Sequence, residues 1–311
     1  MSAAVPAGGS AAGWWRGGLI FLCAVALFAT VDATAKHLVG RYPAPFLNAV
    51  RYAATATVAA VMLARAGRLR FWRTPHRGQL ALRGVMLALV GTCFMTALLW
   101  MPLAEATAIY FMSPLVIVAL SPWLLGEYVG PRKWLAVATG FGGMLLIVRP
   151  GGQLPLLGTL LMVAAALSYA LLQLLTRRLA GKADAGVQYG FAAVICLVAT
   201  GLPAPFFPPA AWPGAADWLA ILAMGFMSAG AQVLLILALQ RAPASTLAPL
   251  NYCHLLLALV YSALWFGRWP DGPALAGIAL IIAAGLSLTL PTRAPAPDGA
   301  RLRSTSTAES S

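Results

Sequence analysis

The chain has 311 residues, of which 61% are hydrophobic and only 9% charged, although its net charge is +13. Soluble domains carry about 25% charged residues, so this composition excludes an ordinary soluble protein and indicates an integral membrane protein. The basic residues lie in short loops between apolar segments, which argues against nucleic-acid binding. The four cysteines lie in four different apolar segments without metal-ligand spacing, so we expect neither a metal nor a cofactor.

Ten apolar segments follow one another along the chain, each bounded by proline, glycine or basic residues. In order they are Gly17–Val39, Pro45–Leu63, Leu80–Met101, Ala104–Leu125, Arg132–Val148, Pro155–Arg178, Gly186–Leu202, Ala216–Gln240, Pro243–Phe266 and Pro273–Leu290. A helix needs about 20 residues to cross the hydrocarbon core of a bilayer. The pattern therefore predicts an all-α integral membrane fold with ten transmembrane helices in the lipid bilayer.

The chain carries an internal repeat at a constant offset of 141 positions, so that Gly84 falls on Gly225 and Pro102 on Pro243. Because five helices per repeat is an odd number, the second repeat enters the bilayer inverted. We predict a cytoplasmic tail over residues 1–16, repeats over residues 17–149 and 155–290, and a disordered cytoplasmic tail over residues 291–311. Inverted repeats are typical of secondary transporters, whose substrate site lies at the midplane between the halves.

The distribution of basic residues predicts the orientation. With the N-terminus inside, sixteen of the 21 basic residues fall in cytoplasmic stretches and four on the opposite side. Cytoplasmic loops are enriched in Lys and Arg. Both termini are therefore expected in the cytoplasm.

Ionisable residues within the predicted helices are candidates for function, because a charge at a helix centre costs about 2.5 to 3.5 kcal/mol on insertion scales. Asp32 and Arg51 both lie roughly 10 Å from the outer ends of their helices, so we expect them to meet. One interpretation is a substrate- or proton-binding site, and the other is a structural ion pair. Lys36, one turn after Asp32, is a competing partner, and the repeat counterpart of Asp32 is Gln173.

A second group of residues is predicted at the midplane, where Ser113 and His254 are repeat counterparts. Pro114 and Pro249 interrupt the two helices, and such breaks are tolerated in membranes where they line a cavity. The further residues of this candidate pocket are Tyr110, Asn251 and Tyr252 beside the breaks, with Tyr169, Gln173 and Gln232 from neighbouring helices. The alternative is ordinary packing of aromatic and proline residues.

The sequence lacks the GxxxxGK[ST], HExxH and GxSxG motifs, which argues against ATP-driven transport and the commoner intramembrane hydrolases. Ser113 and His254 are the one pair that resembles an enzyme's nucleophile and base. We therefore expect a transporter and not an enzyme. An intramembrane enzyme and a non-transporting scaffold are the alternatives.

The chain resembles the drug/metabolite transporter superfamily, in its ten-helix EamA-type branch, over nearly its whole length. The matching stretches are Leu124–Glu127 with Trp134–Pro150 in the first half, and Ala242–Ser245, Phe266–Arg268 and Gly277–Leu286 in the second. Arg268 departs from the family, whose second repeat usually has an acid like Glu127. The resemblance implies a central cavity between helices 1, 3, 4, 6, 8 and 9, with helices 5 and 10 peripheral and a homodimer as a candidate assembly.

The stretch Asp32–Lys36 followed by Tyr42 and Pro43 resembles bacterial members associated with S-adenosylmethionine, riboflavin or metallophore-type solutes. The resemblance thus implies a permease of the bacterial inner membrane that moves a small organic metabolite by alternating access. Proton coupling, exchange and facilitated transport all remain open at this point.

Overall fold

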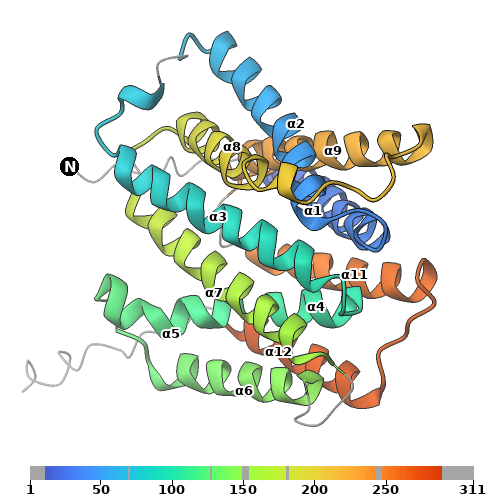
Figure 1. Ribbon diagram of the computed structural model, residues 1–311. Helices are drawn as coiled ribbons and strands as arrows, with labels where there is room; N and C mark the ends of the chain where they lie inside the picture. The colour runs from blue at the N-terminus through green and yellow to red at the C-terminus, as the bar shows by residue number, and fades with distance from the viewer. Residues whose placement is uncertain are drawn as a thin grey trace, which may run out of the picture.

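The computed structural model describes residues 11–68, 71–126, 128–148, 154–179, 182–242 and 247–288, which form helices and connecting turns without a strand (Figure 1). The helices of the first half are α1 (Ala11–Val39), α2 (Ala44–Arg65), α3 (Arg77–Ala97), α4 (Leu103–Tyr110), α5 (Ser113–Leu125) and α6 (Pro131–Val148), with a 3-10 turn η1 (Phe71–Arg73). Those of the second half are α7 (Leu156–Leu179), α8 (Ala185–Gly201), α9 (Ala215–Leu239), α11 (Tyr252–Leu264) and α12 (Gly272–Ser287), with 3-10 turns η2 (Ala204–Phe206) and η3 (Ala248–Asn251). Residues 1–10 and the tail predicted to be disordered lie outside the described residues.

Seven helical stretches are long and apolar enough to cross a membrane, by length and composition, among the residues described. Shorter apolar helices at Pro249–Leu264 and Gly272–Ser287, together with α6, complete the set. Each of the ten predicted segments therefore contains a helix, and the all-helical membrane fold is confirmed. The helix α1 begins at Ala11, six residues before the predicted apolar segment that starts at Gly17.

The contact of α3 on α8 is repeated by the contact of α9 on α2, with the first and second halves exchanged. A Cβ added to Gly84 on α3 would lie 2.8 Å from Cδ1 of Ile195 on α8, and one added to Gly225 on α9 would lie 2.8 Å from Cβ of Ala54 on α2. Gly225 and Ile195 are the 141-offset counterparts of Gly84 and Ala54. The same contact made twice, with the halves interchanged, is what a pseudo-twofold axis between inverted repeats produces.

The axis also relates the packing of α1 on α9 to that of α7 on α3. A Cβ at Gly17 would lie 2.8 Å from Ala242, and one at Gly158 would lie 2.8 Å from Cγ of Met101. Figure 1 shows α3 and α7 running side by side. Each half therefore packs its first helix against the third helix of the other half.

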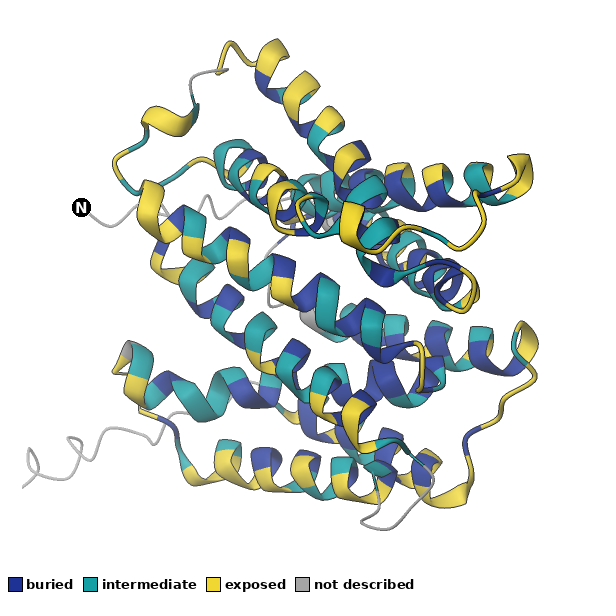
Figure 2. Ribbon diagram, in the orientation of Figure 1, coloured by how far each residue is buried: buried dark blue, intermediate teal, exposed yellow. Residues whose placement is uncertain are grey.

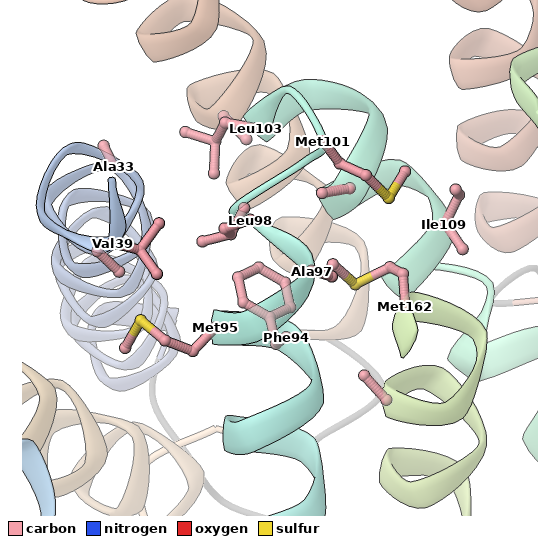
Figure 3. Packing of buried hydrophobic residues seen from close by; sticks show 14 of the residues in the cluster. Ala33, Val39, Phe94, Met95, Ala97, Leu98, Met101, Leu103, Ile109 and Met162 are labelled. Atoms are coloured by element: carbon pink, nitrogen blue, oxygen red, sulfur yellow. The ribbon is translucent and has the colours of Figure 1, made fainter. Parts of the chain in front are cut away.

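The largest buried cluster forms where the end of α3 meets α1, α4 and α7 (Figure 3). Phe94, Leu98 and Met101 contribute from α3 and the turn after it, and Met162 faces them from α7. Exposed residues in Figure 2 lie on the outer faces of the helices and at their ends. Many of these outer residues are large and apolar, as a lipid-facing surface requires.

Helices α6 and α12 pack against each other at the edge of the molecule, away from α1 and α2 (Figure 1). A Cβ at Gly143 would lie 2.7 Å from the carbonyl oxygen of Gly277, and one at Gly277 would collide with the carbonyl of Gly143. Glycine at both positions lets the two backbones touch, as at other small-residue crossings in membranes.

Candidate functional site

The helix predicted over Ala104–Leu125 is in fact two helices, because α4 ends at Tyr110 and α5 begins at Ser113. Pro114 lies at the start of α5 and has no N–H to donate to the carbonyl of Tyr110, four residues earlier. In the second half the 3-10 turn η3 contains Pro249 and ends at Asn251, and α11 begins at the next residue, Tyr252. The structure thus departs from a regular α-helix at equivalent places in the two halves. Residues 243–246, which include the predicted start of the second helix at Pro243, lie outside the described residues.

A contact between an acidic and an imidazole side chain joins the two halves beside these breaks. Oδ2 of Asp32 on α1 lies 3.1 Å from Nε2 of His254 on α11, and the two side chains are only 17% and 12% exposed. The ring of Phe111 meets the imidazole of His254 edge to face, with centroids 5.5 Å apart. The predicted meeting of Asp32 with Arg51 is therefore wrong.

Arg51 instead folds onto its own helix neighbour. Its Nη2 donates to the hydroxyl of Tyr52 at 2.9 Å, and its guanidinium lies 4.6 Å from the centre of the Tyr52 ring. Lys36 also avoids Asp32, because its ammonium donates to the carbonyls of Leu98 and Met101 at 2.6 and 2.9 Å, at the end of α3. Similar depth in the membrane did not bring these predicted partners together.

Aromatic side chains from α3, from α7 and from the break after α4 surround Tyr110, the last residue of α4. Its ring lies 5.4 Å from Phe94 on α3, 6.1 Å from Phe111 and 5.2 Å from Tyr169 on α7, between centroids. We call Phe94, Tyr110, Phe111 and Tyr169 the aromatic cluster, and through Phe111 it connects the Asp32–His254 pair to α3 and α7.

The remaining predicted residues lie around this cluster with different roles. Nε2 of Gln173 donates to the hydroxyl of Tyr169 at 3.3 Å, whereas Gln232 is half-buried and has no hydrogen bond among the residues described. Ser113 is buried but makes no hydrogen bond with His254, so a nucleophile and base are not assembled there. Asn251, at the break, is half-buried.

Tyr252 has its ring against Phe111, with centroids 5.8 Å apart. Its hydroxyl is directed to α12, because a Cβ at Gly285 would collide with it. Tyr252 therefore separates the aromatic cluster from α12 and closes one side of the site.

Sequence reasoning missed Asn48, Tyr52 and Arg83. Asn48 is fully buried and donates from Nδ2 to the carbonyl of Gly91 at 3.2 Å. The signal was available, since Asn48, Arg51 and Thr55 recur at helical spacing on one face of α2. Arg83 lies six residues into α3 and near the start of the predicted segment Leu80–Met101, so it was counted with the basic residues of the cytoplasmic side.

Two polar contacts join the halves at opposite ends of α2. The hydroxyl of Tyr42 donates to Oδ2 of Asp217 at 2.6 Å, and this hydrogen bond raises the pKa of the Tyr42 phenol. Nη1 of Arg68 lies 2.8 Å from Oδ2 of Asp184, and its hydrogen bond lowers the pKa of that carboxyl. Asp184 also caps α8 by accepting from the N–H of Gly186. No group of His, Cys, Asp and Glu suited to a metal occurs among the described residues.

Comparison with known proteins finds a family model described as the EamA-like transporter family, which matches residues 15–149 and 156–290. A riboflavin transporter of Vibrio cholerae is 29% identical, over 86% of this chain and 90% of that protein. The pseudopaline exporter CntI of Pseudomonas aeruginosa is 32% identical over 68% of this chain and 74% of its own length. An S-adenosylmethionine uptake transporter of Rickettsia bellii is 27% identical over 66% and 70%.

A solved crystal structure shares the fold, with a TM-score of 0.63 and 23% sequence identity over 88% of this chain and 96% of that chain. The family and these relatives are transporters and not enzymes.

Proposed function

Because this chain belongs to the EamA-like transporter family of the drug/metabolite transporter superfamily, and so transports small molecules across a membrane, we propose that it is a proton-coupled secondary transporter of an organic metabolite. It is a multi-pass membrane protein, and we place it in the bacterial inner membrane. The excess of basic residues in one set of loops supports cytoplasmic termini. A homodimer through the fifth and tenth helices stays a prediction.

The observation that carries this proposal is the contact between Asp32 and His254. Alternating access requires contacts between the two halves to break, and this contact joins α1 of one half to α11 of the other. A carboxylate separated from its partner inside the protein is left uncompensated, which is destabilising. We propose that a proton delivered to Asp32 neutralises its carboxylate and so lowers the cost of separating Asp32 from His254.

The aromatic cluster supports a solute with a flat conjugated ring. The ring centroids of Tyr110 and Tyr169 lie 5.2 Å apart, and the two residues belong to different halves. A flat ring inserted between them would contact both. Offset or edge-to-face contact of rings contributes about 0.5 to 1.5 kcal/mol beyond burial of area. Riboflavin, the solute named for the Vibrio cholerae relative, has such a ring, and S-adenosylmethionine carries an adenine.

The test is transport by purified protein in liposomes, with riboflavin and S-adenosylmethionine as probes in a wider solute panel. An imposed pH gradient should drive accumulation by the natural protein. We expect Asp32→Asn to lower gradient-driven accumulation at least about tenfold, because asparagine cannot carry the coupled proton. A tenfold change corresponds to about 1.4 kcal/mol of driving free energy. Exchange without a gradient should survive in the variant, since a neutral side chain does not block opening.

Asp271→Asn is the matched control, because Asp271 caps α12 by accepting from the N–H of Ala274 and asparagine caps a helix equally well. It should accumulate solute normally. Full gradient-driven transport by Asp32→Asn would show that Asp32 and His254 form a structural pair. Transport that ignores the gradient in the natural protein would favour exchange or facilitated diffusion.

A further inference from the structure

The connection between α2 and α3 concentrates positive charge. Among the residues described, it carries Arg65 at the end of α2, Arg68 after it, Arg73 at the end of η1 and Arg77 at the start of α3. The sequence contains no acidic residue from position 44 to position 97. Any balancing negative charge must therefore come from another part of the protein or from its surroundings.

Contacts with α8 hold this connection in place. A Cβ added to Gly190 on α8 would lie 2.5 Å from Cδ1 of Leu63, near the end of α2, and 3.7 Å from Cδ2 of Phe71 in η1. The rings of Phe71 and Phe191 meet edge to face, with centroids 5.3 Å apart. The end of α2 and the η1 turn therefore lie against the same part of α8.

One arginine of the connection is paired, and three face outwards. Nη1 of Arg68 lies 2.8 Å from Oδ2 of Asp184, which precedes the first residue of α8. Arg65, Arg73 and Arg77 are exposed, and their side chains make no hydrogen bond or ion pair within the part of the chain that the structure describes. The first two each follow a contact with α8 by two residues. Their positive charges thus belong to one ordered surface.

Trp72 adds an exposed aromatic ring to this surface. Its ring meets that of Phe71 edge to face with centroids 5.4 Å apart, and the residue is 54% exposed. Helix α2 has 22 residues and is about 33 Å long at 1.5 Å per residue, close to the bilayer's hydrocarbon thickness of about 30 Å. The connection at its end therefore lies at the membrane surface, where tryptophan is enriched and where lipid headgroups are located.

The internal repeat shows that the fold does not require these arginines. The counterparts of Arg65 and Arg77 are Phe206 and Trp218, and the second half's connection over residues 202–214 contains no lysine or arginine. Two roles remain for the positive charges, the orientation of the chain during insertion and contact with headgroups afterwards. Only contact with headgroups makes the folded protein respond to the charge of its lipids.

We propose that Arg65, Arg73 and Arg77, together with Trp72, form a docking surface for the headgroups of anionic phospholipids, and we call it the arginine surface. A guanidinium offers several donors that match the oxygens of a phosphate. Basic residues beside a membrane helix attract anionic lipids at the bilayer surface. The partner is a lipid and not the transported solute, so the proposal does not depend on the transport mechanism.

Fluorescence quenching of the purified full-length protein in nanodiscs tests the arginine surface. The lipids are phosphatidylcholine and phosphatidylglycerol with the same acyl chains, and each is used in turn in brominated form, because bromine quenches nearby tryptophan. The quenching that disappears in Trp72→Phe reports the lipid beside Trp72. At equal molar fractions, brominated phosphatidylglycerol should quench Trp72 more strongly than brominated phosphatidylcholine. Added salt should reduce this preference, because exposed charges are screened.

Arg73→Gln and Arg77→Gln should each lower the preference for phosphatidylglycerol roughly fivefold, which corresponds to about 1 kcal/mol for each basic residue near the surface. Arg73→Lys keeps the charge and should retain most of the preference. Arg132→Gln is the matched control, because Arg132 is exposed at the start of α6 and the substitution removes the same charge elsewhere. It should show the full preference.

Thermal unfolding in the same nanodiscs gives a second measurement. Replacing part of the phosphatidylcholine by phosphatidylglycerol should raise the unfolding midpoint of the natural protein, because a ligand of the folded state stabilises it. The rise should be smaller for Arg73→Gln and unchanged for Arg132→Gln. Glycerol phosphate, added to nanodiscs of phosphatidylcholine alone, should not reproduce it.

Equal quenching of Trp72 by the two brominated lipids would overturn the proposal. An equal loss of preference in Arg132→Gln and Arg73→Gln would also overturn it, since it would show a general attraction of lipid to positive charge. Stabilisation by glycerol phosphate as large as that by phosphatidylglycerol would assign the surface to a soluble phosphate compound instead. None of these measurements requires transport, so they are decided separately from the proposed proton coupling.

Discussion

At the scale of single residues, the site depends on a small residue placed opposite large ones. A Cβ at Gly91 on α3 would collide with the hydroxyl of Tyr52 and lie 2.7 Å from Nη2 of Arg51. In the second half the counterpart of Gly91 is Gln232, and the counterpart of Arg51 is Ala192. In the first half the larger side chain, Arg51, is on the second helix, whereas in the second half the larger side chain, Gln232, is on the third. This exchange makes room for Arg51 in one half only.

We predict that Gly91→Val destabilises the protein by about 1 to 3 kcal/mol, as overpacking does in well-packed interiors. The Arg51 guanidinium must also move. The midpoint of unfolding measures the loss of stability. Gly230→Ala on α9 is the control, since nothing lies within 4 Å of a Cβ there and alanine favours a helix. Equal behaviour of the two variants would contradict the prediction.

The position of Asp32 shows how far the sequence leads at this scale. Its depth in the membrane follows from counting residues along a helix at 1.5 Å each. Its partner does not, because several polar residues share that depth and the rotation of each helix about its axis is set by packing. The sequence therefore predicted a carboxylate at this depth, either functional or in a structural ion pair, and paired it with Arg51, whereas the structure places it 3.1 Å from His254.

At the scale of elements, the two interrupted helices carry the site. The break after Tyr110 releases one carbonyl and places the Tyr110 ring at the end of α4, where it contacts α3 and α7. A continuous helix would have kept the residues on either side of the break in one straight register. The break therefore determines that the Tyr110 ring points towards α3 and α7.

Pro114→Ala tests this role, because alanine restores the N–H that the Tyr110 carbonyl lacks. We expect equal or higher thermal stability and a transport rate lower by about tenfold, a barrier increase of about 1.4 kcal/mol. Pro122→Ala is the matched control, since Pro122 lies inside the same helix α5 but away from the break. Normal transport by Pro114→Ala, or equal loss in both variants, would reject a specific role for the break.

Hydropathy predicted the helical segments well because lipid requires every spanning backbone to bond within itself. The division of Ala104–Leu125 was not predicted. Proline is tolerated inside membrane helices, as Pro122 within α5 shows. Whether a given proline ends a helix depends on neighbouring helices, which the sequence pattern does not contain.

At the scale of the whole molecule, the halves are joined by polar contacts at both ends. Asp217 accepts from Tyr42 at one end, and Asp184 pairs with Arg68 at the other. Opening towards either side of the membrane requires the contacts on that side to separate. The duplicated architecture was readable from the 141-residue offset, but these contacts were not, because they involve residues without repeat counterparts of the same kind.

The pair at Asp184 should produce a small pH dependence. Its carboxyl pKa is lowered from the ordinary 3.8, chiefly by the Arg68 hydrogen bond, so the pair stabilises the fold above pH 3.8 and this contribution is lost as the pH falls below it. The side chains are 50% and 51% exposed, so screening limits the effect to less than about 1 kcal/mol.

Asp184→Asn keeps the helix cap and removes the charge. The unfolding midpoint of the natural protein should exceed that of the variant slightly at pH 6, and the difference should vanish in acid. Arg68→Gln should reproduce the same pattern. A difference that grows as the pH falls would have the wrong sign and would contradict the assignment.

The crossing of α6 and α12 at Gly143 and Gly277 has a property that the end contacts lack. Gly140 meets Ala284 there and Gly143 meets Ile281, and these two contacts are images of each other under the 141-residue offset. The Gly143–Gly277 contact is not repeated in this way, because the counterpart positions are Ala284 and Ala136. We expect the two repeated contacts to persist when the halves exchange positions, so the crossing can act as the pivot about which the halves turn.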